Sequence, residues 1–153
     1  MSVLADKIIQ EIDQAATLYH RLILVVAPTG SGKTSAFLDV QKQTGAPVFN
    51  VNLELSRLML ELTERQRSLQ IPRLLSEIAS GSKADMVLLD NIEMLFDVTL
   101  KQDPLRLLQG LSRNMTVVVA WNGIVDGNYL VYAKPDHPEY RRYPIADLRV
   151  VSP

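Results

Sequence analysis

The sequence contains no cysteine among its 153 residues. This absence excludes disulfide frameworks, thiolate nucleophiles and cysteine-ligated metal sites. The chain also has no apolar run of the length that spans a bilayer. Its first residues carry charges at Asp6, Lys7, Glu11 and Asp13, so they lack the uninterrupted apolar core of a secretory signal. We therefore expect a cytoplasmic protein that makes no membrane contact.

A strong charge of one sign is also missing, because 16 Lys and Arg residues stand against 17 Asp and Glu residues. The field of the whole molecule would therefore not drive nucleic-acid binding, and we expect DNA to be contacted only indirectly or through an assembly. The two histidines, His20 and His137, have no second ligand or nucleophile at a useful spacing. This argues against a metal site or a catalytic triad built on them.

The rest of the composition is that of a globular protein, with 47% hydrophobic and 22% charged residues. A chain of this length buries roughly 70% of the surface that its unfolded form exposes, which is enough for one core. We therefore predict a single domain over residues 1–153.

Short β-rich apolar runs alternate with segments of helical periodicity along the chain. Strands are predicted at residues 22–26, 48–52, 86–90 and 115–120. A helix is predicted in the N-terminal segment 1–20, where positions 6–19 have helical periodicity. Further helices are predicted at 34–43, 53–80 and 104–111, and the second of these is expected to break near Pro72. This alternation predicts an α/β fold, a three-layer sandwich with a mostly parallel central sheet and helices on both faces.

The C-terminal segment, residues 128–153, has a different pattern. A strand or hairpin arm is predicted at 129–132, a proline-rich turn at 134–138 and a last strand at 145–151. We expect this segment to form a hairpin followed by the final strand of the domain.

A glycine-rich turn follows the first predicted strand and leads directly into a helix. A phosphate-binding loop requires this order, because successive backbone N–H groups must face inward at a helix N-terminus. Gly30 and Gly32 permit that backbone. The residues expected to contact a nucleotide are Ala27, Pro28, Thr29, Gly30, Ser31, Gly32, Lys33, Thr34 and Ser35.

Lys33 and Thr34 carry the chemistry of this loop. The Lys33 ammonium would reach the β- and γ-phosphates of ATP, and the Thr34 hydroxyl would be a ligand to Mg²⁺. Ala27 replaces the glycine of the usual pattern, which is a mild change if that residue needs no positive φ. The alternative interpretation is a chance Gly/Ser turn beside an exposed lysine.

The third predicted strand ends in a carboxylate, Asp90, at the edge of a parallel sheet where ligands bind. Asp90 would hold Mg²⁺ directly or through water, and the alternative is that it only caps a helix. Glu93 follows within three residues and is the candidate that polarises the attacking water. These two residues predict separate metal-binding and water-activating roles.

Two further groups are candidates for contact with the terminal phosphate. Asn122 stands just past the fourth predicted strand, and in P-loop ATPases with an extra strand between the two Walker strands such an Asn touches the γ-phosphate or the attacking water. The alternative is an ordinary turn Asn before Gly123. Arg141 and Arg142 would stabilise the charge of the transferred phosphate, in cis or in a neighbouring subunit, and the alternative is that they are solvated surface charges.

Four stretches of the chain carry a family resemblance: residues 22–34, 49–56, 62–67 and 87–93. Together they resemble BrxF, the small P-loop protein of type 3 BREX bacteriophage-defence systems. The resemblance implies a bacterial cytoplasmic protein with an AAA-like nucleotide core, acting beside other defence proteins. Two features differ from AAA ATPases: Asn91 stands where their catalytic Glu follows the Walker Asp, and we expect no helical lid domain.

We therefore predict a subunit of an anti-phage defence complex that binds ATP with Mg²⁺ and hydrolyses it as a homo-oligomer. One alternative is a small-molecule P-loop kinase. A second is a nucleotide-dependent binding switch with negligible turnover, which the displaced glutamate supports.

Overall fold

The computed structural model describes residues 2–153, and Met1, the first residue of the predicted N-terminal segment, lies outside them. The described residues form five α-helices: α1 (Val3–Ala15), α2 (Lys33–Thr44), α3 (Val51–Met59), α4 (Glu64–Ser80) and α5 (Pro104–Leu111). They form eight strands: β1 (Leu22–Ala27), β2 (Val48–Asn50), β3 (Met86–Asp90), β4 (Thr116–Asn122), β5 (Ile124–Asp126), β6 (Tyr129–Tyr132), β7 (Arg141–Pro144) and β8 (Arg149–Val151). Two 3-10 helices, η1 (Glu93–Phe96) and η2 (Val98–Leu100), follow β3.

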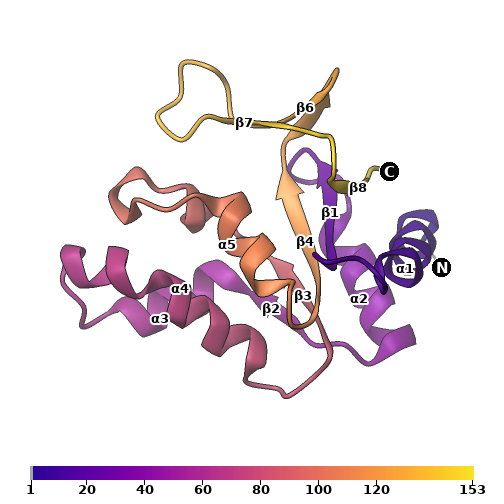
Figure 1. Cartoon of the computed structure of the whole chain (residues 1–153), viewed down its shortest axis with the longest axis horizontal. Helices are drawn as coiled ribbons and strands as arrows, with labels where there is room; N and C mark the ends of the chain where they lie inside the picture. Colours follow the sequence, from indigo (N-terminus) through magenta and orange to yellow (C-terminus); the bar gives the residue numbers. More distant parts are fainter. Residues whose placement is uncertain (1) are drawn as a thin grey trace.

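The main sheet has five strands in the order β2-β3-β4-β1-β8, and every pair in it is parallel. The chain therefore has the predicted α/β fold with a mostly parallel central sheet. Strand β4 lies between β1 and β3, so the ends of these three strands meet at one edge of the sheet (Figure 1). Residues from distant parts of the sequence are thereby brought together at that edge.

Alternate residues of the strands face two separate cores, because side chains in a strand point to opposite faces. In β1, Leu22, Leu24 and Val26 pack with α3, α4 and α5, whereas Ile23 and Val25 pack with α1 and α2. The molecule therefore has three layers, with the sheet between two groups of helices (Figure 1). Among residues 2–153 no helix has the length and apolar character needed to cross a membrane.

Pro72 lies inside α4 without ending it, so the predicted break at this residue is wrong. The proline ring leaves the Ser68 carbonyl without the N–H that a helix normally supplies. Gln102 Nε2 donates to that carbonyl at 2.7 Å instead. The break falls between α3 and α4, where Thr63 and Gln66 form a capping box that begins the second helix.

Several predicted boundaries also move. The first helix ends at Ala15, short of the predicted end, and Tyr19 is exposed rather than packed on a helical face. Strand β2 ends at Asn50 because its side chain accepts a hydrogen bond from Leu53 N at 3.0 Å and so begins α3. The predicted last strand is confirmed only at 149–151, while β4 extends two residues past its predicted end.

The second sheet is antiparallel, with the order β5-β6-β7, and contains the hairpin predicted in residues 128–153. Residues directly opposite each other in antiparallel strands share a face. Ile124, Val131 and Arg142 therefore lie on one face of this small sheet. Leu130 and Tyr143 lie on the other, and Leu130 is fully buried in the core beneath it.

Aromatic packing fixes the small sheet over the ends of β1 and β4 (Figure 1). The Tyr132 ring stacks on Phe96 with centroids 3.5 Å apart, and both meet Trp121 edge to face. Trp121 Nε1 donates to Val131 O at 3.2 Å. A Cβ at Gly123 would lie 2.1 Å from the same carbonyl, so only glycine fits between the two sheets. The small sheet is thus held at the edge where the site residues gather.

Candidate functional site

The turn between β1 and α2 has the backbone that its glycines predict. Gly30 and Gly32 have φ values of 81° and 93°, a region that residues with a Cβ rarely adopt. Gly32 is the N-cap of α2, and no side chain of the described residues caps that helix end. The first backbone N–H groups of α2 are therefore available to a ligand, and an anion is favoured there by the helix dipole.

Lys33 lies beneath this turn and is 5% exposed. Its Nζ donates to Ala27 O at 2.7 Å and to Pro28 O at 2.8 Å. Burial lowers the pKa of Lys33, while the negative charges of Asp90 and Glu93 act in the opposite direction. The ammonium is therefore held close to the turn by two carbonyls and faces two carboxylates across it.

Both carbonyls that bind Lys33 have a second donor. Ala27 O accepts from Gly123 N at 3.3 Å, and Pro28 O accepts from the Ser31 hydroxyl. Loss of the ammonium would therefore leave neither oxygen unsatisfied. The contacts of Lys33 are compatible with a side chain that moves to a phosphate when one is bound.

Thr34 and Asp90 are in direct contact at the end of the sheet. Thr34 Oγ1 donates to Asp90 Oδ2 at 2.7 Å, and Asp90 Oδ1 accepts from Asn91 N at 2.9 Å. Asp90 is buried at the end of β3, whereas Thr34 and Ser35 present exposed side chains in the first turn of α2. The two predicted metal ligands therefore lie side by side.

Asn91 has a φ of 53°, in the left-handed region. Asn tolerates this conformation better than most residues with a Cβ, and a Glu at the same place would be strained. Asn91 O accepts from Asn52 N at 2.8 Å, which ties the turn to the start of α3. The residue after the strand carboxylate thus has a backbone role, and the next carboxylate along the chain is Glu93.

Glu93 is half-buried beside the site. Its Oε1 accepts from Asn52 Nδ2 at 3.4 Å, and its buried Oε2 has no hydrogen-bond partner among the described residues. Burial is the main cause that raises the pKa of Glu93, and the negative charge of Asp90 acts in the same direction. Glu93 therefore offers one acceptor oxygen that has no partner among residues 2–153, and it binds a proton more tightly than an ordinary glutamate does.

Asn52 was missed by sequence reasoning. Its Oδ1 accepts from Met94 N at 2.8 Å, which orients the amide so that Nδ2 faces Glu93. The signal was present, because Asn50 and Asn52 are polar residues in the second half of the predicted strand 48–52, but only the pairing of β2 with β3 places Asn52 beside Glu93.

Asn122 is the last residue of β4 and pairs in register with Ala27 of β1. It lines a cavity of about 500 Å³ between the turn and the small sheet, together with Pro28, Thr29 and Lys134. Asn122 therefore lies at the same sheet edge as the turn and next to open space that a ligand can enter.

Lys134 is a second residue that sequence reasoning missed. It follows Ala133, whose φ of 63° is rare for a residue with a Cβ and turns the chain at the rim of the cavity. No hydrogen bond or ion pair joins the Lys134 ammonium to another of residues 2–153. A free positive charge therefore lines the cavity beside Asn122.

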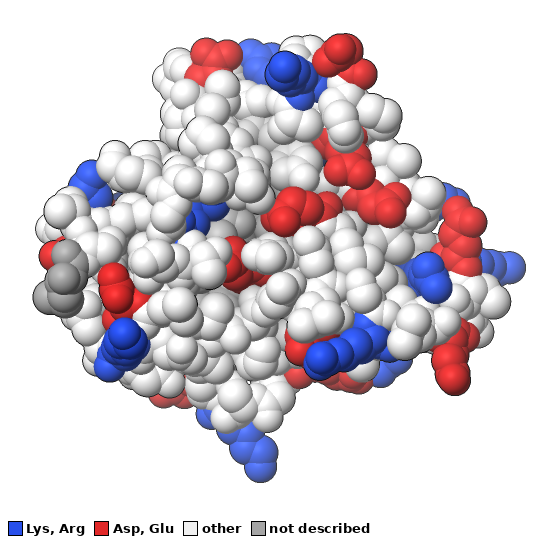
Figure 2. Space-filling model, turned by 180° about the vertical axis from the view of Figure 1, so that it is seen from behind, with Lys and Arg blue, Asp and Glu red and all other residues white. Residues whose placement is uncertain are grey.

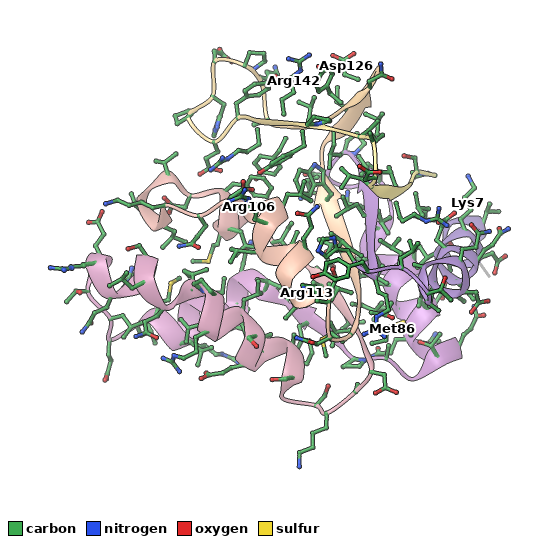
Figure 3. The ribbon with its side chains drawn as sticks, viewed as in Figure 1. Lys7, Met86, Arg106, Arg113, Asp126 and Arg142 are labelled. Carbon is green, nitrogen blue, oxygen red and sulfur yellow. The ribbon has the colours of Figure 1, made fainter. Side chains whose placement is uncertain are left out.

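Arg141 and Arg142 lie apart from this group. Arg141 Nη2 donates to Gln102 O at 2.7 Å on the inner face of the small sheet. Arg142 lies on the outer face, exposed, with its guanidinium 3.5 Å from the centroid of the Tyr129 ring. Figure 3 shows Arg142 near Asp126 at the outer end of the small sheet. No contact joins either guanidinium to residues 27–35 within the described chain.

The charged surface agrees with the balanced composition. On the face in Figure 2, Lys and Arg atoms form separate spots with Asp and Glu atoms among them. This face shows no continuous basic area of the kind that binds a nucleic-acid backbone. Residues 2–153 also contain no group of three His, Cys, Asp or Glu side chains that could hold a metal by themselves.

No family model matches the chain, and no curated protein matches it. Among solved structures, the chain is similar to PCH-2 of C. elegans, with a TM-score of 0.39 and 16% sequence identity. The match covers 97% of this chain and 39% of that one. Because this chain spans well under half of that protein and the likeness is low, no activity is transferred from it.

Proposed function

We propose that this chain is a P-loop protein that binds ATP with Mg²⁺ in the turn between β1 and α2 and hydrolyses it. The observation that carries the proposal is the 2.7 Å contact between Thr34 and Asp90, directly beside the buried Lys33 ammonium. A metal-bound triphosphate needs oxygen ligands for its metal and positive charge for its phosphates. The hydroxyl, the carboxylate and the ammonium provide these at the N-terminus of a helix.

The phosphates would be bound by backbone and by Lys33. The open N–H groups at the start of α2 and the left-handed glycines provide donors on the inner side of the turn. Lys33 would exchange its bonds to Ala27 O and Pro28 O for phosphate oxygens. The exchange is favourable because phosphate compensates a charge that burial disfavours.

The residues present fit Mg²⁺. Thr34 Oγ1 and Asp90 Oδ2 are hard oxygen donors in contact, and Mg²⁺ is usually held by one or two protein oxygens, with phosphates and water completing its shell. Two protein ligands are therefore sufficient. The metal ion, when bound, would neutralise charge on the β- and γ-phosphates.

Hydrolysis needs a group that orients and deprotonates water, and Glu93 is suited to this role. Among the described residues its Oε2 has no hydrogen-bond partner, and Asn52 holds the carboxylate in place. The pKa of Glu93 is raised toward the pH at which a general base works best. Asn122 would contact the terminal phosphate or the water, because β4 lies between β1 and β3. Lys134, on the rim of the same cavity, would supply a second positive charge.

Release of phosphate from ATP without an added acceptor tests the proposal. The wild-type protein should release phosphate steadily in the presence of Mg²⁺, whereas Lys33→Ala should lose nucleotide binding and Glu93→Gln should bind ATP but turn over about 10²- to 10⁴-fold more slowly. Glu61→Gln, at an exposed carboxylate, is the matched control and should behave as wild type. Release only in the presence of a phosphate acceptor would indicate a kinase, and tight binding without release would indicate a switch.

We further propose, from the resemblance to BrxF, that the ATPase is a homo-oligomeric subunit of an anti-phage defence complex. Purification of the tagged protein from its native cells tests this assignment. Recovery of other defence proteins with the wild-type chain supports it. If the chain is recovered alone in a preparation that hydrolyses ATP, the proposed ATPase activity stands and the proposed defence role is rejected.

A further inference from the structure

A second cavity adjoins the phosphate-binding turn and reaches residues that follow β8. It has a volume of about 350 Å³ and continues directly from the turn. Its lining includes Pro28, Ser31, Ile124, Val125, Ser152 and Pro153. Because Pro28 and Ser31 belong to the turn itself, a molecule bound by its phosphates can extend into this cavity without leaving the protein surface.

The strand order gives a bound nucleotide one direction. β1 lies between β4 and β8, and β3, which ends in Asp90, lies beyond β4. The metal-bound and terminal phosphates must lie toward Asp90 and Glu93, since those residues would hold the metal and the water. The nucleoside at the other end of the triphosphate must then lie toward β8, where Val151 is followed by the cavity residues Ser152 and Pro153.

The wall opposite the turn is apolar and open. All of β5, an edge strand of the small sheet, is exposed, and Val125, which lies on the face shared with Leu130, is 39% exposed. Exposed β-branched residues at a sheet edge are unfavourable unless something covers them. No charged or amide side chain lines this cavity, whose polar side chains are the hydroxyls of Ser31 and Ser152.

We propose that this cavity is the base subsite of the nucleotide, with the base packed against Val125 of the small sheet. The inference rests on the proposed nucleotide-binding function and adds the element that binds the base. The small sheet would thus cover the nucleoside. The base is held by apolar contact, since a flat aromatic ring gains from leaving water beside β-branched side chains.

Binding measurements with ADP and with inorganic tripolyphosphate, which has no nucleoside, test the proposal. Val125→Ser is the leading variant because Val125 lines this cavity and not the one beside Asn122, and Ile124→Ser changes the adjacent residue on the opposite face of β5. Val125→Ser should weaken ADP binding about tenfold, by loss of apolar contact, and leave tripolyphosphate binding unchanged, whereas Ile124→Ser should weaken ADP binding less. Leu60→Ser, at a 75% exposed side chain outside both cavities, is the matched control and should bind both ligands as wild type.

Three outcomes are distinguishable by calorimetry on variants shown to unfold at the wild-type temperature. Selective loss of ADP affinity in Val125→Ser, larger than in Ile124→Ser, supports the subsite. Unchanged ADP affinity, or an equal loss for ADP and tripolyphosphate, overturns it while the phosphate site remains. Failure of the wild-type protein to bind either ligand overturns the proposed function itself.

Discussion

Thr34 Oγ1 and Asp90 Oδ2 lie 2.7 Å apart although 56 positions separate the two residues in the sequence. The contact joins the first turn of α2 to the end of β3 across the intervening strand β4. It places a hydroxyl and a carboxylate where one metal ion can bind both, and it makes their separate contributions testable.

Substitution of Asp90 by Asn should abolish the effect of Mg²⁺ on nucleotide affinity. The amide oxygen can accept from Asn91 N and the amide NH2 can donate to Thr34 Oγ1, so the fold should be preserved, but the amide lacks the charge that attracts the metal. ATP affinity measured with Mg²⁺ and with a chelator should differ for the wild-type protein and be equal for the variant. Asp85→Asn, just before the other end of β3, should keep the wild-type difference, and Asp90→Asn with an undiminished Mg²⁺ effect would remove Asp90 from the metal site.

Substitution of Glu93 by Gln should stabilise the protein at neutral pH while slowing hydrolysis. Since the pKa of Glu93 is raised in the folded state, the folded protein binds this proton more tightly than the unfolded chain does. The associated stability is present below the unfolded pKa and is lost as the pH rises through the folded pKa. The neutral Gln avoids this loss.

Denaturant unfolding at two pH values measures the effect. The free energy of unfolding of Glu93→Gln should exceed that of the wild type at neutral pH, and the difference should shrink toward about pH 4, near the usual pKa of a glutamate. An equal difference at both pH values would mean that packing, and not ionisation of Glu93, causes it.

The sequence predicts the part of the candidate site that depends on local pattern and misses the part that depends on strand pairing. Lys33 and Thr34 were predicted because the strand, the glycine turn and the helix are contiguous, and Asp90 was predicted because it ends a buried strand. Asn52 and Lys134 were missed because nothing in their own neighbourhoods predicts that β2 pairs with β3 or that β6 lies over β4. The catalytic roles of all these residues remain predictions.

Asn52 should act through Glu93 as a positioning residue. Asn52→Ala removes the donor to Glu93 Oε1, so it should raise the pKa of Glu93 further and move the acidic limb of the pH–rate profile to higher pH. We expect kcat to fall about tenfold with little change in KM, because within the described chain no hydrogen bond joins Asn52 to residues 27–35. Asn52→Asp keeps the acceptor for Met94 N but loses the donor to Glu93, so it separates the effects of these two hydrogen bonds. An unshifted pH profile in Asn52→Ala would mean that Asn52 only supports the fold.

Pro72 was wrongly predicted to break its helix because the compensating donor comes from Gln102, 30 positions later in the chain. Gln102→Ala should leave the Ser68 carbonyl unsatisfied and cost about 1–3 kcal/mol of stability. In a Pro72→Ala background the helix supplies its own N–H to Ser68, so the same substitution should cost less. A double-mutant cycle by denaturant unfolding measures this coupling, and equal costs in the two backgrounds would show that Gln102 stabilises the protein by another route.

Arg142, and not Arg141, is the residue that we expect to act on the nucleotide of a neighbouring subunit. Arg141 is held by Gln102 O inside its own chain. Among residues 2–153, the exposed Arg142 guanidinium contacts only the Tyr129 ring, a contact worth about 0.5–1 kcal/mol at such a site. Exchanging that contact for a γ-phosphate therefore costs little free energy. An arginine supplied in trans is worth about 10³ to 10⁵ in turnover, so Arg142→Ala should be nearly inactive while it binds ATP normally.

Mixing two inactive variants tests whether Arg142 acts between subunits. A Lys33→Ala subunit can donate Arg142 to the intact phosphate turn of an Arg142→Ala subunit, so the mixture should regain hydrolysis that neither variant shows alone. Turnover per wild-type subunit should also rise with protein concentration, since association completes the site. Arg141→Ala is the matched control, and it should lose stability with the Gln102 contact but keep the turnover of its folded fraction. The prediction fails if the mixture stays inactive although mixed oligomers form, or if monomeric wild-type protein hydrolyses ATP at the full rate. Arg142 is then an ordinary surface charge. Lys134, in the cavity beside Asn122, is left as the positive charge that acts within the same chain.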